Sequence, residues 1–425
     1  MSLLRIGYLL SAELYLGVAW GVVWSVYARR LVDSGFEGGY YGLAGLVLSL
    51  VFSLSTLLAG LSYDRGLRLP VALGSGFALV IGLAALKSNS LAWVSPAVLG
   101  VSMGFHAVVS VYTISACSRF KATAFTLAYS SSLLGVSIGA MLVALGLNVD
   151  GIWVYAVVSA SPIILAVYAF LASTNGGFRG PHSGGFHVIA YFTLLASILG
   201  FSLGMSAYNM DYYMVAFLGA DEKVVGTMYS YAYILAAASS TIIALKLRER
   251  LNPASGHVYA VAAQAAILTI MATMGELTPL ILVYAIRAAL GVLADSLFDT
   301  TYTRLAPESV KGLTISMVMI AYEISSGAGK LAGSLIADGS LWKPLVAASL
   351  IMATYTVIAP QIFKAMEPPE RLRERREHSG SPGREGKPEK PRDPGGLPGF
   401  TIKDNLGHRE KTIIISPPPG PRQRS

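Results

Sequence analysis

Long apolar runs follow one another along this 425-residue chain, with short polar connections between them. We count twelve, at approximately residues 7–28, 40–62, 70–86, 91–114, 124–147, 152–171, 188–210, 224–245, 258–274, 279–301, 313–336 and 344–363. About 20 helical residues cross a bilayer core. Backbone amides in hydrocarbon need internal partners, and barrel strands would be about half as long and alternating in polarity. The pattern therefore predicts an all-α membrane protein with twelve transmembrane helices.

Composition supports this interpretation. Hydrophobic residues make up 54% of the chain, charged residues only 13%, and the mean hydropathy is +0.58. The first run is too long for a usual signal peptide, so we expect it to remain as a helix. A single cysteine, Cys117, excludes disulfides within the chain and argues against thiolate metal sites.

Lys and Arg residues are distributed unequally between alternate connections. One set holds eleven, including Arg65 and Arg68, and the opposite set holds five. The positive-inside rule places the richer set in the cytoplasm. With an even number of spans, both termini are then expected to be cytoplasmic and the protein to be multi-pass in the cell membrane.

The connections also divide the chain. Residues 1–173 form one predicted six-helix half, 174–187 a flexible cytoplasmic linker, and 188–364 the second half. Residues 365–425 contain 11 of the 20 prolines and many charges, and are predicted to be a disordered, basic cytoplasmic tail. This tail either serves as a solvated segment that fixes topology, or contacts anionic lipid headgroups or a partner.

The two halves share sequence landmarks. Gly35 and Gly42 bracket the entry to the second run as Gly219 and Gly226 bracket the entry to the eighth, at an offset of 184 residues. At an offset of 190, Tyr112, Thr113 and Lys121 match Tyr302, Thr303 and Lys311. Agreement on the repeat length indicates a duplication, which is how many transporters build two lobes around a central site.

The charged turn between the second and third runs contains Gly60, Asp64, Arg65, Gly66 and Arg68. It resembles the signature of the major facilitator superfamily, although it is one residue shorter between the arginine and the second glycine. The resemblance covers residues 1 to about 365. It implies a cytoplasmic gate in which the aspartate meets the start of the eleventh helix, near residues 312–314, where a helix N-terminus attracts a carboxylate. Alternatively, the arginines act only as positive-inside anchors.

Few ionisable residues lie within the runs. Placing one near the bilayer centre costs roughly 2.5 to 3.5 kcal/mol, so each calls for a reason. The candidates for transport or coupling are Glu13, His106, Arg287, Asp295, Glu323 and Lys330. The resemblance implies that the first, fourth, seventh and tenth helices line a central cavity.

Three roles compete for these groups. A carboxylate or His106 could load and release a proton, or Arg287 and Lys330 could bind an anionic substrate. The alternative is a fixed pair between Arg287 and Glu323.

Tyr208 and Asn209 are substrate-cavity candidates on the seventh helix, with an interfacial anchor as the competing role. On the fifth helix, residues 135–140 resemble part of an antiporter signature, but Ala140 replaces the expected proline, which weakens a drug-export hypothesis.

The sequence contains no motif for enzymatic, cofactor or metal chemistry. The sequence has no phosphate-binding loop, metal-spaced cluster or nucleophile turn, so we expect no enzyme activity, cofactor or metal. The net charge of +8 is divided evenly between the helical part and the tail, which argues against nucleic acid as a partner.

We therefore expect a monomeric secondary transporter of a small organic solute, working by alternating access and coupled to protons. The alternatives are facilitated diffusion, multidrug-type efflux, or a transport-inactive sensor or assembly factor that signals through its tail.

Overall fold

The computed structural model describes residues 3–117, 121–146, 152–171, 186–242, 252–305, 311–337 and 340–366. Every regular element in these ranges is a helix. The chain separates into two units, Met1–Glu367 and Pro368–Ser425, and all described residues belong to the first. The predicted tail and the core of the predicted linker lie outside the described ranges.

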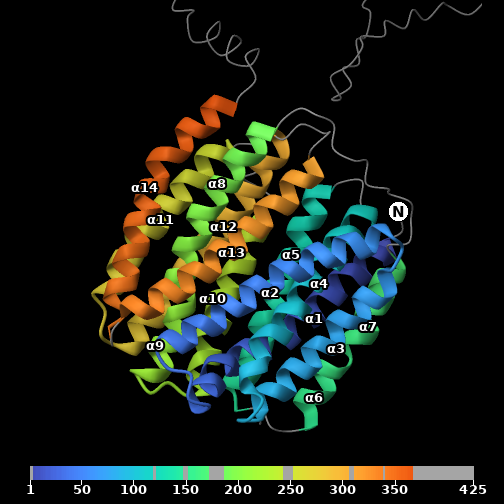
Figure 1. The fold of residues 1–425 in the computed structure, drawn as a ribbon, viewed down its shortest axis with the longest axis horizontal. Coiled ribbons are helices and arrows are strands. Elements are labelled where there is room, and N and C mark those ends of the chain that lie inside the picture. Colours follow the sequence, from blue (N-terminus) through green and yellow to red (C-terminus); the bar gives the residue numbers. More distant parts are fainter. Residues whose placement is uncertain are drawn as a thin grey trace, which may run out of the picture. The chain divides into compact units, whose positions relative to one another are not determined.

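Each of the twelve predicted runs falls on a helix or a succession of helices (Figure 1). Up to residue 171 these are α1 (Leu3–Asp33), α2 (Gly39–Asp64), α3 (Arg68–Lys87), the short 3-10 turn η1 (Ala92–Val94), α4 (Ser95–Cys117), α5 (Lys121–Ala144), α6 (Ile152–Ser159) and α7 (Ser161–Leu171). From residue 186 onwards they are α8 (Phe186–Leu203), the π-helical turn η2 (Gly204–Tyr208), α9 (Asn209–Ala216), α10 (Glu222–Ile242), α11 (Pro253–Ala272), α12 (Leu277–Leu305), α13 (Lys311–Ala337) and α14 (Trp342–Met366).

Within the described residues, nine helices or helix successions are long and apolar enough to cross a membrane. The succession from α8 to α9 counts among them, whereas α10, α13 and the short α6 and α7 do not. The chain is thus a multi-pass helical membrane protein, and a total of twelve spans stays a prediction.

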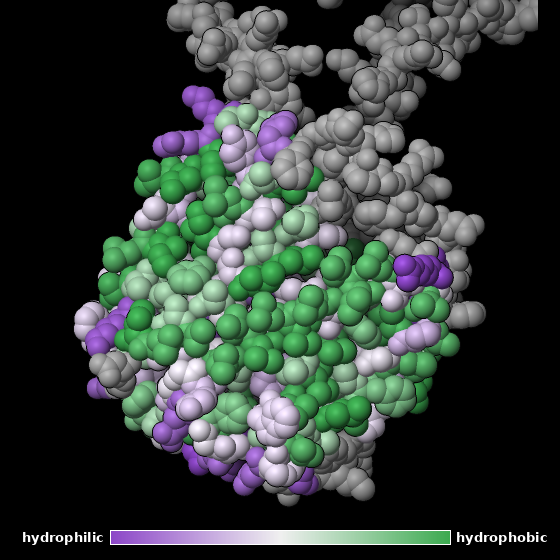
Figure 2. Space-filling model, viewed as in Figure 1, coloured by the Kyte–Doolittle hydropathy of each residue, from purple (hydrophilic) through white to green (hydrophobic). Residues whose placement is uncertain are grey.

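Large apolar side chains face outward along these helices. On α2 they include Leu54, Leu57 and Leu58, and on α3 Phe77 and Ile81. Figure 2 shows hydrophobic residues covering much of one face, with hydrophilic residues gathered near its ends. An exposed apolar surface of this kind fits contact with lipid tails.

Helix pairing in the second set of helices repeats that of the first. In the first set α1 packs on α5, α2 on α4, and α3 on both α4 and α7. In the second, α8 packs on α13, α10 on α12, and α11 on both α12 and α14. The sets meet where α5 contacts α10 and α2 contacts α13, and these four helices lie centrally in Figure 1.

Glycines set the closest of these approaches. Gly17 and Gly21 of α1 lie against the backbone of α5, at Ser132 and Val136. Gly200 of α8 and Gly204 of η2 lie in the same way against α13, at Tyr322 and Ser326. Both glycines recur at an offset of 183 residues, close to the repeat length of the other landmarks. Small residues allow membrane helices to pack with their backbones in contact.

The packing predicts a large stability effect at one of these glycines. A Cβ at Gly200 would overlap the carbonyl of Tyr322, so Gly200→Val should force α8 and α13 apart. Overpacking of this kind typically costs about 1–3 kcal/mol. Thermal unfolding in detergent should show a lower midpoint for Gly200→Val, whereas Gly7→Val, where no atom lies within 4 Å of the added Cβ, should unfold like wild type. Equal midpoints for the two variants would contradict the packing.

The charged turn has a clear backbone geometry. α2 ends at Asp64, and Gly66 follows with φ at +82°, the left-handed conformation that glycine adopts without strain. The amide of Leu67 donates to the carbonyl of Ser62 at 2.9 Å, as in a Schellman helix end. Gly66 therefore ends α2 and lets the chain reverse into α3.

Candidate functional site

Three clusters of buried polar side chains between the described helices contain predicted candidates. The first joins α1 and α4, the second joins α9, α10 and α12, and the third joins α2 and α13. Burial of a polar group costs free energy unless it gains hydrogen bonds, and inside a membrane ionisable groups mark functional pathways by default. These clusters are therefore the candidate site.

Glu13 is the centre of the first cluster. Its side chain on α1 is only 3% exposed, and its Oε1 accepts a hydrogen bond of 2.6 Å from the Ser110 hydroxyl on α4. Nε2 of His106, one turn earlier on α4, lies 3.7 Å from Oε2 of Glu13. The fold thus brings two predicted candidates together, and the pair can hold and exchange a proton.

We call the second cluster the tyrosine cluster: Asp211 of α9, Tyr229 and Tyr233 of α10, and Tyr284 and Arg287 of α12. The Tyr229 hydroxyl donates to Oδ2 of Asp211, and its ring stacks on Tyr233 with the centroids 5.7 Å apart. The guanidinium carbon of Arg287 lies 5.9 Å from the centre of the Tyr284 ring. Arg287 was predicted as a candidate, whereas Asp211 and the tyrosines were not.

The third cluster crosses from α2 to α13. Nζ of Lys330 donates to the Ser49 hydroxyl at 2.8 Å, and that hydroxyl lies 3.5 Å from Oε2 of Glu323. Ser49 thus links two predicted candidates seven residues apart on α13. Glu323 is directed to Ser49 and Lys330, so the alternative of a fixed pair between Glu323 and Arg287 is wrong for this conformation.

Asp295 lies on α12 two turns beyond Arg287 and is half-buried. It lies close enough to Arg287, Asp299 and Glu323 to interact with their charges. The second and third clusters are therefore electrostatic neighbours, while Glu13 and His106 form a separate pair.

Some predicted site residues have side chains outside the described part of the chain. These are Tyr208, Asn209 and Asp64. Their backbone is described: Tyr208 ends the π-helical turn η2, and Asn209 begins α9. Of the remaining residues of the charged turn, Arg65 is exposed and Arg68 is half-buried. The gate contact predicted for Asp64 thus stays a prediction.

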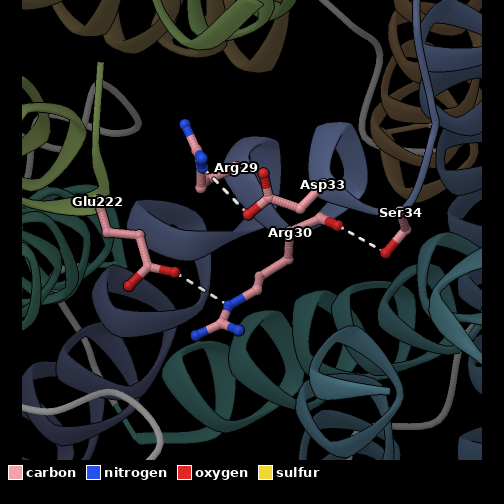
Figure 3. Close-up of polar contacts among 5 residues, drawn as sticks. All are labelled: Arg29, Arg30, Asp33, Ser34 and Glu222. Carbon is pink, nitrogen blue, oxygen red and sulfur yellow. Dashed lines mark hydrogen bonds and ion pairs between the residues drawn. The ribbon is translucent and has the colours of Figure 1, made fainter. Parts of the chain in front are cut away.

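Further contacts between the two sets of helices lie at the end of α2 opposite the charged turn. Nε of Arg30, on α1, lies 2.9 Å from Oε1 of Glu222, on α10 (Figure 3). Nearby, the amide of Gly38 donates to the Tyr212 hydroxyl at 2.6 Å, and Tyr212 stacks on Tyr41 of α2. We call this end the Arg30 end; its contacts tie α1 and α2 to α9 and α10.

No group of His, Cys, Asp and Glu among the described residues has a metal-binding arrangement. The chemistry offered by the three clusters is instead proton exchange, ion pairing and hydrogen bonding. In each cluster the interacting side chains come from helices in different segments of the chain.

Comparison with known proteins gives a likeness in structure alone. No protein-family model matches the sequence, and no curated protein matches it. The structure is similar to the crystal structure of the human organic anion transporter MFSD10 (TETRAN), with a TM-score of 0.61 and 14% sequence identity over 85% of this chain and 98% of that one. The likeness shows that the chain has the major facilitator fold, which confirms the predicted resemblance at the level of fold.

Proposed function

We propose that this multi-pass helical protein with the major facilitator fold is a proton-coupled secondary transporter of a small organic solute. The fold supports transport as the general activity. The observation that carries proton coupling is the pair of Glu13 and His106, buried between α1 and α4. A carboxylate at this depth is costly to keep unless it has a function.

We propose that transport proceeds by alternating access of two lobes. The repeated helix pairing supports two lobes of similar construction, and α5 with α10 and α2 with α13 form the contacts between them. The ion pair at the Arg30 end supports closure of that end in this conformation. The charged turn is proposed as the gate of the opposite, cytoplasmic end, with Asp64 meeting the start of α13.

The proposed solute carries an anionic group. Arg287 is 5% exposed, and its Nε makes no hydrogen bond within the described residues, so it is able to donate one to an anionic group. The similar human protein is named as an organic anion transporter. We further propose a location in the cell membrane with both termini cytoplasmic, and a monomer as the working unit.

Reconstitution in lipid vesicles tests the function. Full-length protein should give saturable uptake of organic solutes that rises several-fold when a pH gradient is imposed. Arg287→Ala should lower uptake at least tenfold. Deletion of residues 367–425 should leave most of the flux, whereas a sensor would lose its output on that deletion. No flux of any solute class and no proton movement would exclude transport.

A further inference from the structure

We infer that the transported solute is bipolar, with a cationic group held by Asp211 and an anionic group held by Arg287 across the tyrosine cluster. The inference rests on the proposed transport function and names its substrate class. A small amino acid, with an ammonium and a carboxylate, is the simplest solute of this kind.

Asp211 and Arg287 are both buried charges. Their side chains are 6% and 5% exposed. Within the described residues, neither takes part in an ion pair. The charge of Asp295 reaches Arg287, but the two form no ion pair in the described part of the chain. A buried charge outside an ion pair is destabilising, so two such residues, on helices that both contact α10, call for a ligand that pairs with both.

Each charge keeps one polar atom available. Tyr229 occupies Oδ2 of Asp211, whereas Oδ1 has no hydrogen-bond partner in the described part of the chain. Arg287 likewise keeps an unused Nε donor there. Tyr229 orients the Asp211 carboxylate, and the Tyr284 ring lies against the Arg287 guanidinium, so a ligand would meet one unused acceptor and one unused donor.

The tyrosines connect the two charges. Tyr233 and Tyr284 each lie close enough to both Asp211 and Arg287 to interact with their charges. Tyr233 stacks on Tyr229, which is hydrogen-bonded to Asp211, while the guanidinium carbon of Arg287 lies 5.9 Å from the centre of the Tyr284 ring. Aromatic faces also attract an ammonium group, which favours the cationic end of a solute near Asp211.

Helix geometry gives the approximate spacing along the bundle. Arg287 follows the start of α12 by ten residues, about 15 Å, and Asp211 precedes the end of α9 by five, about 8 Å. Both of these helix termini lie at the Arg30 end. The two charges therefore lie about 8 Å and about 15 Å into their helices from that end, where charge-assisted hydrogen bonds to a solute would be shielded from water.

A solute with a single charge fits less well. An anion alone would compensate Arg287 and leave the Asp211 carboxylate buried without a cation. A cation alone would pair with Asp211 and leave Arg287 without an ion pair. Only a bipolar solute satisfies both groups at once, which predicts that loss of either charge from the solute weakens binding.

Binding to the purified full-length protein tests the solute side. The probes are L-alanine, L-phenylalanine and the ω-amino acids from glycine to 6-aminohexanoate, compared with their N-acetyl derivatives, which keep only the anion, and their methylamides, which keep only the cation. The best bipolar probe should bind at least tenfold more tightly than either of its derivatives. Absence of binding by every bipolar probe, or equal affinity for the three forms, would overturn the inference.

Two variants test the protein side. Asp211→Asn should lose at least tenfold in affinity for the bipolar probe and keep wild-type affinity for its N-acetyl form. Arg287→Gln should also lose at least tenfold in affinity for the bipolar probe, but it should keep wild-type affinity for the methylamide. The same changes in an exposed pair, Asp33→Asn and Arg29→Gln, should alter none of these affinities. Equal loss for all probe forms in both variants would contradict the assignment.

Flux measurements separate this inference from the proposed function. Saturable, Asp211-independent flux of solutes that are anions alone would leave transport standing and remove the bipolar site. Absence of flux for every solute, as described above, would instead exclude transport itself.

Discussion

Glu13→Gln is expected to reduce the accumulation that a pH gradient drives at least tenfold, while exchange of solute across the vesicle membrane continues. Glutamine keeps the shape of the side chain, and its amide oxygen can still accept the hydrogen bond from Ser110. It cannot take up a proton. Under the proposed coupling, the lobes would therefore still move with solute bound, but the gradient would no longer drive them.

Paired uptake assays with labelled solute measure both activities in the same vesicles. Glu276→Gln serves as the matched control because Glu276 is exposed in the connection before α12, and it should accumulate solute like wild type. His106→Gln should reduce accumulation less than Glu13→Gln, since the carboxylate remains. Accumulation that is unchanged in Glu13→Gln would remove proton coupling through this residue and leave transport intact.

The helices were predictable because length and apolarity decide them before any tertiary contact forms. The ends of helices were harder. Arg29 and Arg30 were placed in a connection, yet α1 continues through both to Asp33. The arginines are satisfied within the structure, since Arg29 lies 3.0 Å from Asp33 and Arg30 contacts Glu222, a residue far along the chain. Charge therefore did not mark the end of the helix.

The candidate site was predictable only in part, because sequence identifies costly residues but not their neighbours. Glu13 and His106 were singled out separately, and their pairing depends on how α1 and α4 pack. Ser49 gave no signal, since serine is common in membrane helices and its partners Glu323 and Lys330 lie more than 270 residues away. Asp211 was overlooked among aromatic residues that were interpreted as interfacial anchors.

One missed feature did have a sequence signal. Gly17 and Gly21 recur as Gly200 and Gly204 at an offset of 183 residues, within one residue of the offset found from the other glycines. A repeat search restricted to glycines within the apolar runs would have found them. Their equivalence follows from the same requirement in both places, a close approach between two helix backbones.

The Arg30 end is the clearest place to test alternating access, because an ion pair joins α1 to α10 there. Both side chains are partly exposed, at 26% for Arg30 and 23% for Glu222. Such pairs contribute about 0.2–1 kcal/mol, and reversal of one charge replaces attraction by repulsion. The expected change is therefore about 1–2 kcal/mol in the balance between closed and open states, a factor of roughly 5 to 30 in their populations.

Arg30→Glu should shift the protein toward a state open at the Arg30 end, because two carboxylates would then face each other between α1 and α10. Spin labels at positions 37 and 221, in a Cys117→Ser background, would report the opening as a larger population of long distances. Adding Glu222→Arg restores opposite charges and should return the wild-type distribution. Arg29→Glu is the matched control, since Arg29 pairs with Asp33 on its own helix, and it should leave the distances unchanged. If Arg30→Glu and Arg29→Glu gave the same distribution, or if the charge-exchanged double variant failed to close, the ion pair would not be what holds this end shut.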